Sequence, residues 1–391
     1  MTSPNTTILE TPGSALSHEA FYQFCQQGTR IEDYPLAARI ASRVPVYSGA
    51  VALEHAESPT GRRALLAEWH RCLLEGPGVL VLQGMYADLD VVDMASRCFE
   101  AIIEEERNSA GDGDHFAPPG SNDRIWNAFQ KHGERDPANF LDYYSNPLLG
   151  LVSEAWLGPG YQLTAQVNVV KPGGKPQSPH RDYHLGFQSP DMVARYPLAV
   201  QHASQLLTLQ GAVAHSDMPT ETGPTRLLPY SQRYREGYLA YHDPALRDYF
   251  QEHFVHLPLA KGDGLFFSPA LFHAAGENRT HDRRRMANLL QVSSAFGRAM
   301  ETVDTRRLIE ACYEALTQRV ASFGLAAPQT RACIDAVAEA YPFPTNLDRT
   351  PPIDGMAPES QHQLLERALK EAWPLDQLRQ ALKGQEKARQ A

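Results

Sequence analysis

Residues 178–184 read SPHRDYH and follow an apolar run, 163–171, that is typical of a β-strand. The motif places His180 and Asp182 two positions apart at the end of this run. Side chains two apart on an extended chain point to the same side, so an imidazole and a carboxylate can face one metal ion. The stretch therefore predicts half of a metal site carried on β structure.

Several further short β-type runs surround this motif, separated by glycine and proline. They are 205–214, 225–228, 264–268 and 285–294. Regularly spaced short strands with turn signals between them are typical of an all-β sandwich or barrel. We expect the β-rich core to extend from about Tyr161 to Gly297.

A third candidate ligand, His273, lies 93 positions beyond His180 in the stretch LFHAAGEN, directly after another apolar run. Two histidines and one carboxylate on adjacent strands would form a facial triad, which suits Fe(II) because three positions stay open. Arg284 follows 11 residues later at the start of the last strand. Its guanidinium could pair with the distal carboxylate of a dicarboxylic 2-oxo acid.

The amino-acid composition limits which class of protein and which partners are expected. The chain has 391 residues, 42% of them hydrophobic, and a formal net charge of −10. These values fit a globular protein and argue against nucleic-acid or anionic-membrane partners, which attract a basic excess. There is no run of 18 apolar residues, the start MTSPNTTILE lacks the features of a secretory signal, and the five cysteines show no C-x-x-C pair. We expect a cytoplasmic protein.

Helical patterns flank the β region on both sides. We expect an N-terminal helical arm over 1–60, a core domain with supporting helices over 61–297, and a C-terminal helical extension over 298–391. Within the arm the helical patterns cover 19–27 and 34–42. Ser360-x-x-Gln363 resembles a capping box and starts an amphipathic helix. The leucine stripe that follows could pack on its own domain or form a homodimer.

The spaced motifs together resemble the phytanoyl-CoA dioxygenase family. The resemblance rests on HRDYH, on GPTRLLP at 223–229, on Lys261-Gly262-Asp263 leading to His273, and on Asn278 and Arg284 behind it. A Lys-Pro loop, VVKPGG at 169–174, precedes the motif as it does in that family. The similarity covers roughly 78 to 297. It departs from the family at Pro229-Tyr230-Ser231-Gln232, where Pro-Gly-Ser-His is often found, and at Ala275.

This resemblance implies a mainly β core, a double-stranded β-helix (jelly roll, cupin-like), flanked by N- and C-terminal helices. It implies Fe(II) held by His180, Asp182 and His273, with 2-oxoglutarate and O2 as cosubstrates and Arg284 on the 5-carboxylate of 2-oxoglutarate. The implied reaction is hydroxylation, or another oxidation at a C–H bond, of a small organic molecule with release of succinate and CO2.

Five more residues are candidates for the site or its surroundings. Gln166 and Gln177 could hydrogen-bond the cosubstrate, and Tyr183 and His184 could lie on the substrate side of the iron. His115, in a Gly- and Pro-rich stretch at 108–123, could belong to a lid over the site.

Two other functions stay open on the sequence. One is a cupin-type metal enzyme that acts without 2-oxoglutarate, and the other is a catalytically silent jelly-roll binding protein. The expected partners are a small-molecule substrate and, through the terminal helices, a second copy of the chain.

Overall fold

The computed structural model describes residues 16–109, 122–352 and 355–390. Contacts within the chain divide it into two compact units, and each unit is assembled from separate stretches of sequence. The first unit takes in the described parts of 1–85, 114–122 and 169–287, and the second those of 86–113, 123–168 and 288–391. This division does not follow the three consecutive domains expected from the sequence, which stay a prediction.

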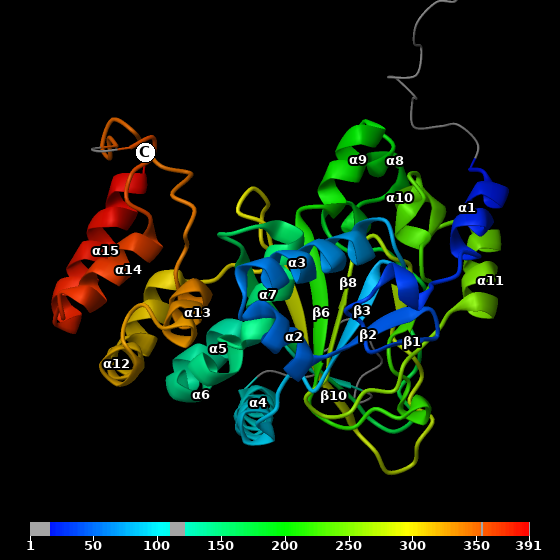
Figure 1. Ribbon diagram of the computed structural model, residues 1–391, viewed down its shortest axis with the longest axis horizontal. Helices are drawn as coiled ribbons and strands as arrows, with labels where there is room; N and C mark the ends of the chain where they lie inside the picture. The colour runs from blue at the N-terminus through cyan, green and yellow to red at the C-terminus, as the bar shows by residue number, and fades with distance from the viewer. Residues whose placement is uncertain (1–15, 110–121, 353–354, 391) are drawn as a thin grey trace, which may run out of the picture. The chain divides into compact units, whose positions relative to one another are not determined.

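The first unit is built on a large mixed sheet (Figure 1). Its strands, in spatial order, are β1 (Arg39–Ala41), β2 (Val44–Ser48), β3 (Val79–Gln83), β8 (Gly264–Phe267), β6 (Thr208–Ala214) and the start of β10 (Arg285–Ser293). Strand β2 runs parallel to β3, while β8 pairs antiparallel with both β3 and β6. Leu265 of β8 lies between Val81 and Ala212, and this central part of the sheet is buried.

A second, small sheet pairs β7 (Arg226–Leu227) with β9 (His273–Ala274). Antiparallel bridges extend it on both sides, from His180 to His273 and from Leu227 to Val255. The small sheet therefore carries two of the three predicted metal ligands, His180 and His273, on neighbouring segments of the same chain.

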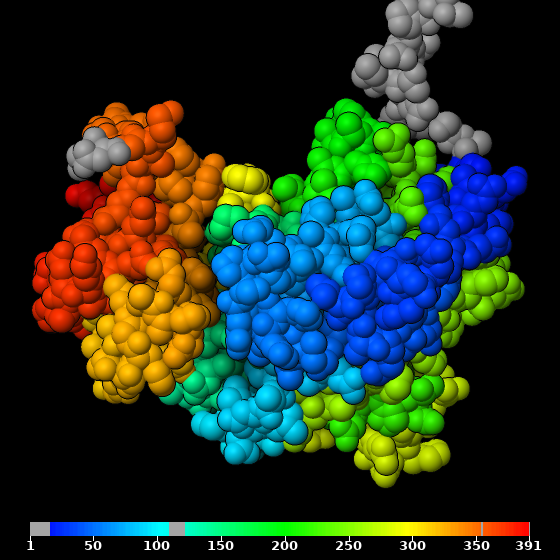
Figure 2. Space-filling model, in the orientation of Figure 1, coloured from blue at the N-terminus to red at the C-terminus, as the bar shows by residue number. Residues whose placement is uncertain are grey.

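Helices cover the first unit, and their ends are set by local sequence. They are α1 (His18–Cys25), α2 (Gly49–Ala56), α3 (Pro59–Leu74), α8 (Pro190–Val193), α9 (Leu198–Gln205), α10 (Gly237–Ala240) and α11 (Pro244–His253), with 3-10 turns η1 (Ile31–Asp33), η2 (His184–Phe187), η3 (Thr220–Thr222) and η4 (Ser231–Arg233). Ser58 caps α3 by accepting the Gly61 N–H, and Pro59 fits the first turn because its missing N–H would have no helical partner. On the face in view, α3 and the N-terminal arm form a continuous blue surface (Figure 2).

The N-terminal arm is fixed by aromatic packing. Helix α1 lies beside α11 (Figure 1), and Phe21 packs edge-on against Tyr249 with 6.0 Å between ring centroids. Phe21 is fully buried in a cluster that also includes Phe250 and Phe272. The arm thus belongs to the same core as the segment that leads to His273.

The second unit joins a smaller part of the β structure to a helical layer. Its strands follow the order β10, β5 (Gln162–Val170) and β4 (Asn122–Ile125). Its helices are α4 (Leu89–Ser109), α5 (Ala128–Arg135), α6 (Pro137–Tyr144), α7 (Pro147–Leu157), α12 (Thr305–Phe323), α13 (Pro328–Val337), α14 (Gln361–Lys370) and α15 (Leu375–Arg389).

The C-terminal leucine stripe is used inside this second unit. Leu364, Leu365, Leu369, Leu378 and Leu382 are all buried in the single chain. Helices α14 and α15 run side by side at the red end of Figure 1. Of the two alternatives that the sequence left open, packing on the chain itself is the one observed. None of the helices in the described part of the chain is both long and apolar enough to cross a membrane.

The predicted fold class, a β-rich jelly-roll core with helices added at both ends, is confirmed by the large mixed sheet, the small sheet and the flanking helices. One helix prediction in the arm is wrong. Residues 34–42 form a turn and strand β1, because Arg39–Ala41 pairs antiparallel with β2 and the Ala38 N–H donates to the Val46 carbonyl. Pairing with a neighbouring strand overrides the local helical pattern.

Candidate metal centre

His180 and His273 face each other across the bridge of the small sheet. The N–H of His180 donates to the His273 carbonyl at 3.0 Å, and the N–H of His273 donates back at 3.1 Å. The side chains of residues directly opposite each other on antiparallel strands project to the same face of the sheet. The two imidazole centroids lie 4.5 Å apart. The backbone pairing therefore fixes the distance between the two imidazoles.

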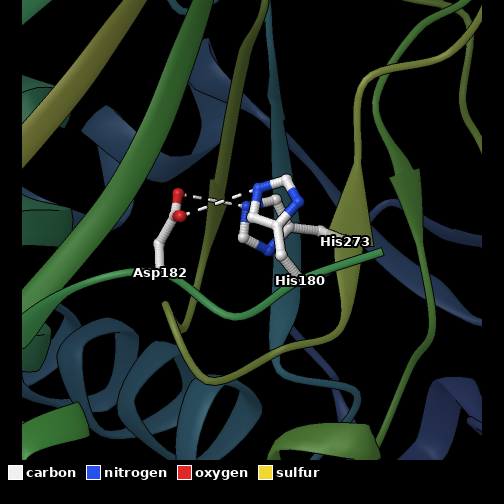
Figure 3. A group of neighbouring side chains, drawn as sticks. All are labelled: His180, Asp182 and His273. Atoms are coloured by element: carbon white, nitrogen blue, oxygen red, sulfur yellow. Dashed lines mark ion pairs between the residues drawn. The ribbon is translucent and has the colours of Figure 1, made fainter. Parts of the chain in front are cut away.

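Asp182 completes the group from two residues further along the same chain. Its N–H donates to the Pro269 carbonyl at 3.1 Å. One carboxylate oxygen lies 3.6 Å from Nε2 of His180 and the other lies 3.3 Å from Nε2 of His273. Figure 3 shows the carboxylate facing both rings, and the three ligand atoms lie within 4.8 Å of one another.

The other ring nitrogen of each histidine is held by the main chain. Nδ1 of His180 lies 2.8 Å from the Ser178 carbonyl, and Nδ1 of His273 lies 2.8 Å from the Leu271 carbonyl. A carbonyl only accepts hydrogen bonds, so the proton of each neutral ring belongs on Nδ1. The lone pair on each Nε2 is then available to a metal, which is the usual orientation of a metal-binding histidine.

The electrostatics of the group favour the charged form of Asp182. Burial on its own would raise the pKa of Asp182, but His180, His273 and a hydrogen bond from Gln210 hold that pKa well below its usual range. Burial lowers the pKa of His180, although Asp182 opposes this shift. Nε2 of Gln210, on β6 of the large sheet, donates to Asp182 at 2.5 Å.

These residues fit an Fe(II) site. Two neutral imidazoles and one carboxylate form the donor set in which Fe(II) oxygenases leave positions open for other ligands. The held Nδ1 atoms and the hydrogen-bonded carboxylate supply the outer contacts that such ligands require. The side chains of His180, Asp182 and His273 could therefore hold the metal as predicted.

The predicted anchor for the cosubstrate, Arg284, and its neighbour Arg285 differ in burial. Arg284 is exposed just before β10, whereas the first residue of β10, Arg285, is only 7% exposed. Burial lowers the pKa of Arg285 to about 10, and its Nη1 is buried without a hydrogen-bond partner among the described residues. Strand alternation separates the two side chains, and the strand directs Arg285 inward. The role of Arg284 as the anchor stays a prediction.

The two predicted glutamines have other partners. Oε1 of Gln177 accepts the Ala275 N–H at 3.2 Å, so this side chain braces the chain after β9. Gln166 belongs to the second unit, where its Oε1 accepts from Arg124 at 3.1 Å and its Nε2 lies 3.5 Å from Glu301. Both partners of Gln166 thus belong to its own unit.

Tyr183 and His184 directly follow the ligand Asp182, in a strained backbone. Their φ angles are 68° and 44°, in the left-handed region that residues with a side chain rarely adopt. Tyr183 is buried, and Nε2 of His184 is buried without a hydrogen-bond partner in the described structure. Such strain often marks functional sites. His115 lies outside the described residues.

Two residues of this region were not anticipated from the sequence. Gln210 is one of three polar side chains in the run 205–214, with Gln205 and Thr208, and the pattern alone does not mark it as the one that contacts Asp182. Arg181 sits between the two ligands of the motif and is 1% exposed, although an arginine in a loop usually faces solvent.

Comparisons with known proteins show which family the chain resembles. The family model described as phytanoyl-CoA dioxygenase (PhyH) matches residues 74–286. Peroxisomal phytanoyl-CoA dioxygenase of Rattus norvegicus is 27% identical over 239 residues, which is 55% of this chain and 65% of that protein. The chain thus spans just under two thirds of the length of this relative.

Two solved structures are also similar. One is the epimerase SnoN in complex with Fe3+, alpha ketoglutarate and nogalamycin RO, at 19% identity and a TM-score of 0.41, covering 61% of this chain and 85% of that one. The other is the non-heme alpha ketoglutarate dependent carbocyclase SnoK, at 20% identity and a TM-score of 0.42, covering 56% and 80%. Since the family model spans more than half of its residues, this chain belongs to the phytanoyl-CoA dioxygenase family.

Proposed function

We propose that this protein is an Fe(II)- and 2-oxoglutarate-dependent oxygenase that hydroxylates, or otherwise oxidises at a C–H bond, a small organic molecule, with release of succinate and CO2. The observation that carries the proposal is the orientation of the three ligands. Both histidines present Nε2 to the space beside Asp182 because both Nδ1 atoms are held by main-chain carbonyls. Family membership supports the same activity.

His180, Asp182 and His273 would hold the iron, and Gln210 would keep the carboxylate of Asp182 in place. Iron with 2-oxoglutarate supplies, when bound, an oxidant strong enough for unactivated C–H bonds. Arg285 replaces Arg284 as the residue that would bind the 5-carboxylate of 2-oxoglutarate. No carboxylate of the described residues forms an ion pair with Arg285, and a buried guanidinium without one is suited to an anionic ligand.

Tyr183 and His184 would lie on the substrate side. The buried Nε2 of His184 lacks a partner in the described structure, so a hydroxyl or carbonyl group of a substrate could satisfy it. The name of the rat relative points to a CoA thioester for that protein. The net charge of −10 on this chain gives no reason to extend that preference here. A homodimer remains a further proposal, although the C-terminal stripe is already covered.

The proposal is tested by anaerobic titration of the purified protein with Fe(II) and then with 2-oxoglutarate. The expected result is the weak visible charge-transfer band of the chelated iron in the wild type and its loss in His180→Ala. Iron binding without the band would favour a cupin-type enzyme that does not use 2-oxoglutarate. A folded protein that binds no iron would instead favour a silent jelly-roll protein.

The cosubstrate anchor is tested by a matched pair, Arg285→Leu and Arg284→Leu. We expect Arg285→Leu to raise the Kd for 2-oxoglutarate on the order of 100-fold, because a charge-assisted hydrogen bond to a carboxylate contributes up to about 3 kcal/mol. Arg284→Leu removes the same charge from an exposed neighbour and should leave the Kd within about twofold. The opposite ranking of the two variants would restore Arg284 as the anchor.

A further inference from the structure

A buried arginine separates the two metal ligands of the HRDYH motif. The side chain of Arg181 is among the largest that are fully buried in the described structure. It forms no ion pair with a carboxylate of the described residues, and its Nε has no hydrogen-bond partner. A buried charge without a counter-ion is costly, so its retention calls for a compensating role.

The guanidinium of Arg181 is held by main-chain carbonyls and aromatic rings. Its Nη2 donates to the carbonyls of Ser231 and, at 3.2 Å, of Tyr234. Its Cζ lies 5.1 Å from the ring centroid of Phe272 and 5.5 Å from that of Tyr238. The planar guanidinium can donate hydrogen bonds from its edge while its faces lie against aromatic rings.

These contacts connect the segments that carry all three ligands. Arg181 lies between His180 and Asp182 in the chain, while Phe272 directly precedes His273. Ser231 contacts both sides, since its carbonyl accepts from Arg181 and its Oγ accepts the Phe272 N–H at 2.8 Å. Contacts among Arg181, Ser231 and Phe272 therefore join the segment that carries His180 and Asp182 to the segment that carries His273.

Gly237 provides the space that this linkage needs. A Cβ atom at position 237 would lie only 1.7 Å from Cζ of Arg181 and 1.9 Å from its Nη1. The φ of Gly237 is not positive, so glycine is required here by the closeness of Arg181 and not by the backbone. Alanine at this position would displace the guanidinium without changing its charge.

We propose that Arg181 is a positioning residue that fixes the relative placement of His180, Asp182 and His273 through its buried contacts with Ser231 and Phe272. The inference rests on the proposed metal centre. Residues that orient metal ligands without touching the metal commonly change metal affinity by about 10- to 100-fold when they are replaced.

The test is titration of the metal-free protein with Co(II) alone, followed by the visible d–d absorption, for the wild type, Arg181→Met and Gly237→Ala. Both variants should raise the Kd for Co(II) by about 10-fold or more and change the shape of the spectrum. Gly237→Ala keeps the test decisive if Arg181→Met does not fold. Circular dichroism confirms that each variant tested is folded.

The matched control is Arg43→Met. Arg43 also donates to two main-chain carbonyls of the first unit, those of Cys25 and His253, but it is not adjacent to a metal ligand. This variant should lose stability and keep the wild-type Kd for Co(II). Folded Arg181→Met or Gly237→Ala with wild-type Kd and spectrum would overturn the positioning role alone. A wild type that binds no Co(II) would overturn the metal centre as well.

Discussion

Gln210 is the residue through which the large sheet supports the metal ligands. Its Nε2 donates to Asp182, while its Oε1 is buried without a hydrogen-bond partner in the described structure. A buried amide that is only half satisfied contributes little to stability, because the unmade hydrogen bond offsets the one that is made. The side chain is better explained by what it does to the Asp182 carboxylate.

We expect Gln210→Met to weaken metal binding while leaving the fold intact. Methionine has a similar volume and removes the donor together with the unsatisfied oxygen, so the free energy of unfolding should change by less than about 1 kcal/mol. The Kd for Co(II) should rise about 10- to 100-fold, measured by titration of the metal-free protein.

A buried glutamine away from the site provides the control. Nε2 of Gln201 donates to the carbonyls of Val193 and Tyr196, and Gln201→Met should lower stability without changing the Kd for Co(II). Unchanged Co(II) affinity in Gln210→Met would mean that Asp182 is held well enough by its own backbone.

Among individual residues, the sequence brings the three metal ligands together more readily than it identifies the polar residues that surround them. His180 and Asp182 are local to one motif, and His273 follows from its strand, so spacing brings them together. Arg284 and Arg285 differ by one position, and only the actual start of β10 decides which of them points inward. Gln166 and Gln177 could not be assigned because their partners, Arg124 and the Ala275 N–H, come from other parts of the chain.

Among the elements, those with strong internal patterns were predictable. The β-type runs at 264–268 and 285–294 contain β8 (Gly264–Phe267) and β10 (Arg285–Ser293). The arm and the short helices around the small sheet depend on distant partners instead. Strand β1 exists because β2 pairs with it, and the small sheet depends on a bridge between residues far apart in the sequence, His180 and His273. The local pattern of apolar and polar residues does not show which distant segment a strand or short helix will pack against.

The capping box that starts α14 gives a prediction at the scale of an element. Oγ of Ser360 accepts the Gln363 N–H at 3.2 Å, and Oε1 of Gln363 accepts the Ser360 N–H at 2.8 Å. We expect Ser360→Ala to lower the free energy of unfolding by about 1 kcal/mol, measured by urea denaturation, because the Gln363 N–H at the helix start loses its acceptor.

The comparison variant for the capping box is Gln363→Met, which removes only the reciprocal bond. It should cost less than Ser360→Ala. Equal stability of Ser360→Ala and the wild type would show that α14 is held by its buried leucines alone.

For the whole molecule, the two units are not consecutive domains. Each is assembled from separate stretches, and the boundary falls within three strands, after Asn122 in β4, after Asn168 in β5 and after Ala287 in β10. A strand that is continuous through both units cannot unfold in one of them while staying fully formed in the other. Unfolding should therefore involve the whole chain at once.

We expect a single calorimetric transition that shifts as a whole on metal binding, although all three ligands belong to the first unit. Free Co(II) at 100 times its Kd should stabilise the folded protein by about 2.7 kcal/mol, and removal of the metal with EDTA should reverse the shift. Asp182→Ala is the control, since it retains both histidines but should show no shift at that concentration. Two transitions, of which only one moves with Co(II), would mean that the units unfold separately and that metal binding stabilises only the unit that carries its ligands.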